Sequence, residues 1–404
     1  MQMCAAFPKL EIKTNFMSIL FLLALVGVLS STVFEGMALT AAARYLAARR
    51  TRKKATVDFT PPVSILKPLH GSFPQLADFL RAYFELDYPN YEILFCAHRA
   101  DDPGLEVARS VAAQYPQVPV KFLHTGEPPW INARCYSLSF LVKAAQHEIM
   151  VITDPDVRVT SDYLSSMVQP FSSPKIDVVT CMYRGTPINA GLWERLEALG
   201  MSVEMTAGVV VADMLEGVRF TLGPSTAVRR GALDAIGGFQ ALSSYAADDY
   251  MLGKLVSDKG GGVVLGDYAV DHCIFKSSFR KTLDHQLSWM RSTRFSRPKG
   301  HFGTGLTFAV PYGILALLFA LPLGHPWLGI AIFAWTFIAR VILSVVEGGL
   351  VVRDSAAIKY SFLYPLRDLM GFALWIASYW SPRLLWHGRV FRLLPGGTIE
   401  RWQS

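Results

Sequence analysis

Residues 149–156 read IMVITDPD, a short apolar run followed by two aspartates one residue apart. Its length and its β-branched side chains predict a strand that is buried on both faces. Asp154 and Asp156 then project beyond the end of that strand. Carboxylate oxygens are the ligands that Mg²⁺ and Mn²⁺ take, with substrate phosphates completing the coordination shell. Because D-x-D is common in turns, it is the position after a buried strand that favours a site for metal and diphosphate.

The segments before this strand alternate short apolar runs with amphipathic stretches. We expect strands at 63–66, 91–96 and 120–123, and helices at 76–86, 104–115 and 135–145. This alternation predicts an α/β fold with a mainly parallel sheet covered on both faces. Ligands of such sheets bind beyond the carboxyl ends of the strands. The sequence has no G-x-G-x-x-G or Walker A motif, which disfavours dinucleotide redox enzymes and P-loop NTPases.

Three further polar clusters stand at the ends of predicted elements. Lys67 follows the first strand and suits an anionic ligand, although a solvated loop lysine has the same sequence. Asp102 precedes a helix, which it either caps or leaves free to bind a ribose or a base. Asp248 and Asp249 open the amphipathic segment 251–259. A plain helix start is the alternative there, but Asp249 is the candidate general base, since burial would raise its pKa usefully.

The composition points to a membrane protein. The 404 residues are 51% hydrophobic and carry 39 Lys and Arg against 32 Asp and Glu, and the mean hydropathy is +0.30. So apolar a chain is neither disordered nor an ordinary soluble enzyme, and its length allows two or three units. The five cysteines form no C-x-x-C pair. That spacing argues against a disulfide framework or a zinc site and suits a reducing compartment.

Four apolar stretches are long enough to span a bilayer: 16–39, 306–323, 327–352 and 362–380. A buried core helix is the alternative for each, and it is strongest for the last, because Arg367 and Asp368 interrupt that stretch and charges inside lipid are costly. A cleaved signal peptide is disfavoured at the N-terminus because the apolar run is too long.

Basic residues give the expected orientation. Two lysines precede the first stretch and six Lys or Arg follow it between 44 and 54, which predicts that 46 to about 300 lie in the cytoplasm. Three full crossings would then place the tail from Pro382 outside, whereas its four arginines argue for inside. One stretch would therefore be re-entrant or interfacial.

Two more segments suggest contact with lipid. Residues 284–302 interleave four basic residues with Leu287, Trp289, Met290 and Phe295. This pattern predicts an amphipathic helix on the bilayer surface, whose bases suit anionic lipid or a diphosphate. A nucleic-acid partner is excluded because membrane segments flank the helix. The apolar stretch 201–214 is equally compatible with docking on lipid and with a core helix.

Taken together, these motifs resemble the ceramide glucosyltransferases, and almost as well the bacterial enzymes that glycosylate hopanoid lipids. The likeness runs from about Val63 to Arg294, with a weaker echo at 388–399. The motifs are KPLHG (67–71), FELDYPNYEILFCAHRADDPG (84–104), TDPDVRV (153–159), AADDYMLGKL (246–255), the region of Trp289, and HGRVFRLLPGGTIE (387–400).

The resemblance implies a GT-A fold, a UDP-sugar donor and a divalent metal, Mg²⁺ or Mn²⁺. It implies that Asp102 contacts the uridine, that Asp154 and Asp156 hold the metal and diphosphate, and that Asp249 is the catalytic base. The parts expected from the sequence are a tail (1–15), a transmembrane helix (16–45), a basic linker (46–60), a cytoplasmic GT-A domain (61–275), an interfacial helix (276–300), C-terminal transmembrane helices (301–381) and a basic tail (382–404).

The chain departs from the family pattern at three positions. In the element Q/R-x-x-R-W, which ends at Trp289, His285 replaces Gln or Arg and Ser288 replaces Arg. A serine cannot supply a cationic fork to phosphate, and Arg291, about one helical turn further on, is the candidate substitute. Arg134 stands where the family has the Lys of Asn-x-Lys. The predicted donor side is therefore Lys67, Asp102, Arg134, Asp154, Trp289 and Arg291, and the acceptor side is Asp248, His285 and Trp289.

The predicted function is inverting transfer of a hexose, glucose foremost, from a UDP-sugar to the hydroxyl of a ceramide-like lipid, at the bacterial inner membrane or an equivalent membrane. Transfer of N-acetylglucosamine to a hopanoid or another bacterial lipid is the first alternative. A polysaccharide synthase would share the carboxylates but needs a transmembrane tunnel. A non-catalytic nucleotide-sugar binder is disfavoured by the intact aspartates, and a transporter by the soluble centre and the few spans.

Overall fold

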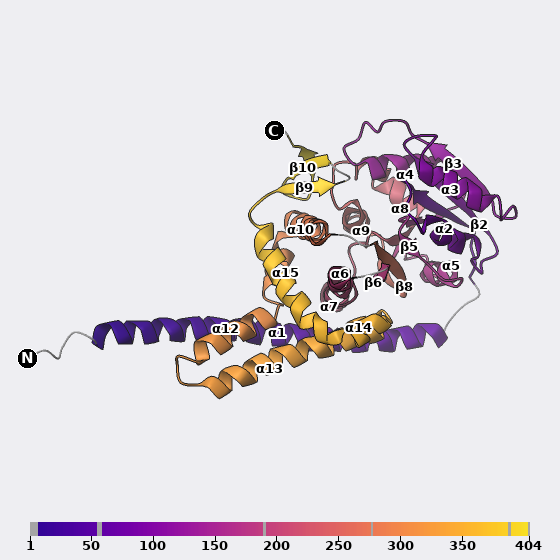
Figure 1. Cartoon of the computed structure of the whole chain (residues 1–404). Helices are drawn as coiled ribbons and strands as arrows, with labels where there is room; N and C mark the ends of the chain where they lie inside the picture. The colour runs from indigo at the N-terminus through magenta and orange to yellow at the C-terminus, as the bar shows by residue number, and fades with distance from the viewer. Residues whose placement is uncertain (1–6, 55–58, 189–190, 276–277, 387–388, 403–404) are drawn as a thin grey trace, which may run out of the picture.

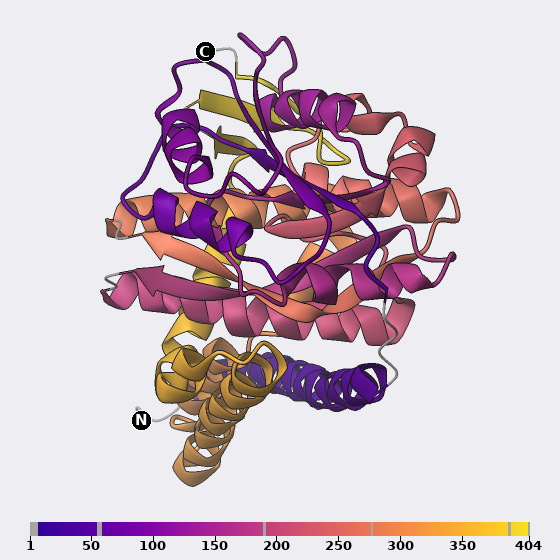
Figure 2. The same ribbon diagram turned by 90° about the vertical axis from the view of Figure 1, so that its right-hand side faces the viewer.

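The computed structural model describes residues 7–54, 59–188, 191–275, 278–386 and 389–402. An α/β unit stands above a long N-terminal helix, and a hairpin of apolar helices lies beside one half of that helix (Figure 1). A view turned by 90° shows the sheet with its helices above, and below them the N-terminal helix and the C-terminal apolar helices, together called the membrane-type helices (Figure 2).

The α/β unit is built on an eight-stranded sheet of order β3-β2-β1-β4-β7-β6-β8-β5. Its first four strands are parallel, and the chain order reverses between β1 and β4, which is where such sheets bind ligands. β7 is antiparallel to both of its neighbours, whereas β6 and β8 run parallel. The strands are β1 (Val63–Pro68), β2 (Tyr91–Ala97), β3 (Val120–His124), β4 (Ile149–Thr153), β5 (Val157–Arg158), β6 (Val178–Ile188), β7 (Ser225–Arg229) and β8 (Val263–Phe275).

Side chains alternate across this sheet and bury both of its faces. Ile65 and Ile93 join one core cluster, while the adjacent Leu66 and Leu94 join another. This arrangement confirms the predicted sheet covered on both sides. The covering helices are α2 (Leu76–Phe84), α3 (Pro103–Ala112), α4 (Ala133–Ala144), α5 (Tyr163–Val168), α8 (Arg230–Ala235) and α9 (Asp248–Asp258).

The first helix is longer than the sequence suggested. α1 runs from Phe7 to Lys54, so most of the predicted linker 46–60 is helical, because no Gly or Pro interrupts the chain between 37 and 60. Its first half exposes apolar side chains such as Leu22 and Leu29, and its second half buries one face, with Ala38, Ala42 and Tyr45, against the protein. Residues 55–58 of that linker lie outside the described part of the chain.

The C-terminal apolar segments form a hairpin and a return helix. α12 (Val310–Ala320) packs on α13 (Pro326–Leu343), which the π-helix η4 (Ser344–Val351) continues, and both contact α1. Among the described residues, three helices are long and apolar enough to cross a membrane: 15–52, 192–216 and 326–351. A fourth candidate is the pair α11 (Pro298–Gly305) and α12, bent by 41°.

α15 (Tyr364–Ser378) accounts for the charges in the last apolar stretch. Arg340 Nε lies 3.1 Å from Asp368 Oδ1, and Arg367 Nη2 lies 2.9 Å from Glu204 Oε2. Both charges of α15 therefore pair inside the protein rather than face lipid, and α15 is not one of the three helices above. The core-helix alternative is the one that the structure favours for 362–380.

A continuous apolar helix links the sheet to α1. It consists of α6 (Leu192–Leu199), the π-helix η2 (Gly200–Met205) and α7 (Thr206–Glu216). Val203 and Val210 are buried in one cluster with Ala38 and Ala42 of α1. Residues 201–214 thus pack as a core helix between the α/β unit and the membrane-type helices.

The predicted basic tail is a small antiparallel sheet of β9 (Arg383–Trp386), β10 (Arg389–Leu393) and β11 (Ile399–Arg401). Ile399 N donates to Ser244 O at 2.8 Å and Ala246 N to Gly397 O at 3.0 Å, so this C-terminal sheet lies on the α/β unit. The tail therefore lies on the same side as the α/β unit, which its arginines favour and which three full crossings would not allow. His387 and Gly388, which open the last motif, lie outside the described residues.

Candidate active site

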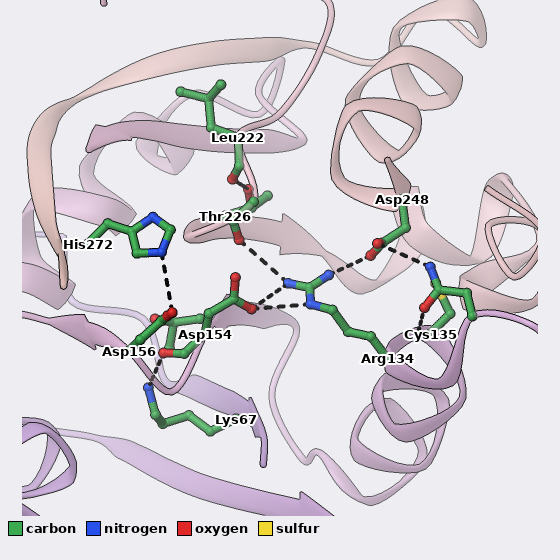
Figure 3. Close-up of polar contacts among 12 residues, drawn as sticks. Lys67, Arg134, Cys135, Asp154, Asp156, Leu222, Thr226, Asp248 and His272 are labelled. Carbon is green, nitrogen blue, oxygen red and sulfur yellow. Dashed lines mark hydrogen bonds and ion pairs between the residues drawn. The ribbon is translucent and has the colours of Figure 1, made fainter. Parts of the chain in front are cut away.

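Lys67 supports the D-x-D turn from beneath. Its Nζ donates to the backbone oxygen of Asp154 at 3.0 Å (Figure 3). The same Nζ stands 3.7 Å from the ring centre of Tyr83. The residue is fully buried at the end of β1. Burial lowers the pKa of Lys67 to about 7, against the opposing effect of the nearby aspartates. Its ammonium thus stabilises the turn after β4, and the predicted contact with a ligand stays a prediction.

Asp156 is paired with a histidine that sequence reasoning missed. β5 and β8 are antiparallel and place Val157 opposite His272, whose Nε2 lies 3.3 Å from Asp156 Oδ2 (Figure 3). Burial alone would lower the pKa of His272, but the Asp156 carboxylate outweighs it and raises that pKa. Burial would raise the pKa of Asp156, but His272 outweighs burial and lowers that pKa. A lone histidine in an apolar strand carries no distinguishing signal in the sequence.

This pair is suited to a divalent cation. Asp156 Oδ1 and His272 Nδ1 are both buried and have no hydrogen-bond partner among the described residues. No described group of three or more His, Cys, Asp or Glu side chains is arranged to hold a metal ion. An unpaired carboxylate oxygen beside an imidazole nevertheless fits a cation that takes its remaining ligands from a diphosphate.

Arg134 joins the D-x-D turn to the start of α9. It lies in the first turn of α4, where Asn132 Oδ1 accepts from Cys135 N at 3.1 Å and caps the helix. Its Nη2 is 2.9 Å from Asp154 Oδ1, and its Nη1 pairs with Asp248 (Figure 3). Burial and Asp156 raise the pKa of Asp154 despite this arginine. The guanidinium therefore holds two carboxylates from separate elements in one place.

Asp249 has the environment expected of a base. Its backbone oxygen accepts from Thr221 Oγ1, and a Cβ added at Gly223 would stand 2.8 Å from its Oδ2. Burial, with the neighbouring charge of Asp248, raises the pKa of Asp249 to about 6. Asp248, Asp249, Arg134 and Gly223 line one small cavity. Asp248 itself is buried and paired with Arg134.

Asp102 connects the loops that follow β1 and β2. Its Oδ1 accepts from Gly104 N at 2.8 Å and caps α3, and both of its oxygens accept from Gly71 N at 3.1 Å. Capping, one of the two readings of this position in the sequence, is therefore present. Its contact with uridine stays a prediction.

The side chains of Trp289 and His285 lie next to each other, near the Asp156–His272 pair. Both lie on α10 (Phe279–Ser296), with ring centres 4.3 Å apart, and the Trp289 ring is 6.4 Å from that of His272. His285 Nδ1 is 3.0 Å from Oε1 of Glu197 on α6, a second residue that the sequence did not indicate. Because α6 and α10 are far apart in sequence, only the tertiary fold brings this pair together.

Arg291 points to another partner. Its Nη1 donates to the backbone oxygen of Arg383 in β9 at 2.9 Å. Ser288 is buried and its Oγ donates to Asp284 O within the same helix. In this arrangement Arg291 ties α10 to the C-terminal sheet, and its role as a phosphate contact stays a prediction.

Comparisons with known proteins identify a family for this chain. The model of glycosyl transferase family 21 matches residues 21–399. Ceramide glucosyltransferase 1 of Caenorhabditis elegans is 22% identical over 84% of this chain and 73% of its own. The ceramide glucosyltransferase of Komagataella phaffii is 34% identical over 29% of this chain and 24% of its own. A solved mannosyltransferase from Pyrobaculum calidifontis, in complex with GDP-Man and Mn2+, covers 87% of this chain and 99% of its own at 18% identity and a TM-score of 0.47.

The family model spans nearly the whole chain, and the structure joins an α/β sheet to apolar helices long enough to cross a membrane. This chain therefore belongs to glycosyl transferase family 21.

Proposed function

We propose that this enzyme moves a hexose, glucose foremost, from a UDP-sugar to the hydroxyl of a ceramide-like membrane lipid. The observation that carries the proposal is the convergence of Asp154 and Asp248–Asp249 around Arg134, next to the Asp156–His272 pair. The curated relatives named ceramide glucosyltransferase support the choice of substrates.

In this proposal the nucleotide-sugar lies over the carboxyl ends of β1 and β4. Asp156 and His272, with Asp154, would hold Mg²⁺ or Mn²⁺, and such a cation supplies positive charge for the leaving diphosphate. Trp289 offers a ring face to the sugar. Asp102 and the loop after β1 would receive the uridine, as the family resemblance implies.

Asp249 takes the proton from the lipid hydroxyl. The hydroxyl oxygen forms a bond to the anomeric carbon while the bond from that carbon to the diphosphate oxygen breaks with both electrons. Attack from the face opposite the diphosphate inverts the carbon and gives a β-glycoside. A carboxylate with a pKa of about 6 is ionised near neutral pH and is still a useful base.

The membrane helices keep the acceptor in its bilayer. Drawing a lipid chain into water costs about 0.8 kcal/mol for each CH₂ exposed, so the enzyme gains by meeting the head group at the surface. We place the catalytic domain in the cytoplasm, because the basic end of α1, with Arg49, Arg50 and Arg52, lies on the side of the α/β unit.

The test is to incubate the full-length protein in bilayer nanodiscs with each of several UDP-sugars, with and without Mn²⁺, and to identify the lipid products by mass spectrometry. The proposal expects one hexose on a ceramide-type lipid, made from UDP-glucose. N-acetylglucosamine on a hopanoid would favour the first alternative, and a sugar polymer would favour a polysaccharide synthase. UDP release without any glycosylated lipid would contradict lipid transfer.

A further inference from the structure

Glu197 and His285 form a carboxylate–imidazole pair at the edge of the site. Glu197 lies on α6 and its side chain is only 4% exposed, whereas that of His285, on α10, is 52% exposed. A buried carboxylate thus holds a histidine that remains open to a ligand. Neither the D-x-D turn nor Asp249 uses this pair.

The contact fixes which nitrogen of the ring carries a proton. An ionised carboxylate only accepts hydrogen bonds, so His285 Nδ1, at 3.0 Å from Glu197 Oε1, is the donor. In the neutral ring, Nε2 then holds a lone pair and can only accept.

The pair also lies close to the chemistry. The His285 ring rests against Trp289, whose ring is 6.4 Å from His272, and His272 contacts Asp156. α6 continues through η2 and α7 onto α1. His285 therefore stands between the metal candidates and the helix that leads to the membrane, which is the side from which a lipid head group arrives.

We propose that Glu197 is a positioning residue that orients His285 so that Nε2 accepts a hydrogen bond from the head group of the lipid acceptor. The ligand would be a lipid that carries a donor, a hydroxyl or an amide N–H, besides the hydroxyl that reacts. This inference rests on the proposed function and names how the same site recognises its acceptor.

The test compares Glu197→Leu, His285→Ala and the double variant in the full-length enzyme in nanodiscs. Initial rates are measured against ceramide concentration at saturating UDP-glucose, and against UDP-glucose at saturating ceramide. Losing one hydrogen bond from the bound lipid should raise the acceptor KM about tenfold in each single variant. The donor KM should change by less than about twofold. Because Glu197 acts through His285, the double variant should be no worse than His285→Ala.

Glu194→Leu is the matched control, because Glu194 is buried on the same helix but caps its first turn by accepting from Gly191 N at 2.9 Å. It should lower thermal stability without changing the acceptor KM. An unchanged acceptor KM in His285→Ala would overturn the inference while leaving lipid transfer intact, and so would losses that add in the double variant. A wild-type enzyme that glycosylates no lipid would overturn the proposed function and this inference with it.

Discussion

At the scale of single residues, the charge on Asp249 should set the pH dependence of catalysis. The carboxylate accepts a proton only when it is ionised, and burial beside Asp248 raises its pKa to about 6. As the pH falls through 6 the protonated fraction grows, so kcat/KM should drop about tenfold for each further pH unit. A pH–rate profile of the wild-type enzyme checks this. A profile that stays flat down to pH 4.5 would contradict the assignment.

Gly223 leaves room for the Asp249 carboxylate. A Cβ at this position would lie 2.8 Å from Asp249 Oδ2, so Gly223→Ala must displace the base. We expect kcat to fall at least about tenfold, since a 1 Å misplacement of a catalytic group can cost more than that. Gly208→Ala on the exposed side of α7 is the control, because its Cβ meets open space and should leave kcat unchanged. Equal activity of the two variants would show that Asp249 tolerates the shift.

The sequence located the acidic residues better than their contacts. Asp154, Asp156 and Asp249 could be singled out as candidates because they follow or open elements with a clear apolar pattern. His272 and Glu197 could not, since their significance arises from the pairing of β5 with β8 and the packing of α6 on α10. The structure shows that Lys67 is fully buried. One sequence does not reveal burial, so it could not distinguish a lysine that supports the turn from an exposed lysine that contacts a ligand.

At the scale of elements, the C-terminal sheet holds α10 against the loop before α9. Gly396 N donates to Phe295 O on α10, while Gly397 O and the backbone of Ile399 bind residues 244–246. The sheet thereby connects the helix of Trp289 to the segment that presents Asp249. Neither contact could be read from the arginine-rich sequence, which indicated only a basic tail.

Substitutions in its turn test this connection. Gly396 and Gly397 both have positive φ, 88° and 86°, but only a Cβ at Gly397 would collide with Ser296. Each Ala variant should be destabilised by about 1–2 kcal/mol, because a residue with a Cβ is strained in the left-handed conformation. Gly397→Ala should lose more unfolding free energy than Gly396→Ala and should also lose activity, as measured by thermal unfolding and initial rates. Indistinguishable variants would mean that the sheet does not support the site.

The elements themselves were predictable where their apolar pattern is strong. β1, β2 and β4 match the predicted ranges closely because each is fully or largely buried. β3, at the edge of the sheet, also matches its range although it is only partly buried. β6 and β8 are long and only partly buried towards their ends, with glycines and charged residues among the apolar ones, so their pattern is weaker. α1 is longer than predicted because an apolar stretch indicates only the part of a helix that lies in lipid, and the helix continues beyond it.

At the scale of the whole molecule, the α/β unit is fixed to the membrane-type helices. Arg184 Nη1 donates to Val352 O at 3.0 Å, and Ser202 Oγ donates to Asp354 Oδ2 at 2.7 Å while accepting from Gly185 N. Gly185 lies opposite His272 in the pairing of β6 with β8. The catalytic sheet is thus attached to the end of η4, and this attachment holds the site at a fixed distance from the bilayer.

Buried ion pairs stabilise this assembly. Arg340 and Asp368 are 2% and 3% exposed, and Asp368 Oδ2 also accepts from the first amides of α12. Arg340→Leu leaves Asp368 unpaired and should lower the free energy of unfolding by about 3–5 kcal/mol. Arg340→Leu with Asp368→Asn should recover most of that loss, because Asn keeps the capping oxygen. Denaturation in detergent measures both, and an equally unstable double variant would contradict the account.

The most direct test of the central claim is Asp249→Asn in the full-length enzyme, assayed for glucosylceramide formation and for UDP-glucose binding by calorimetry. Transfer should fall by about 10²–10⁴-fold while UDP-glucose binds as it does to the wild type, because a general base is lost but the donor site is not. Near-normal transfer by the variant would contradict the account.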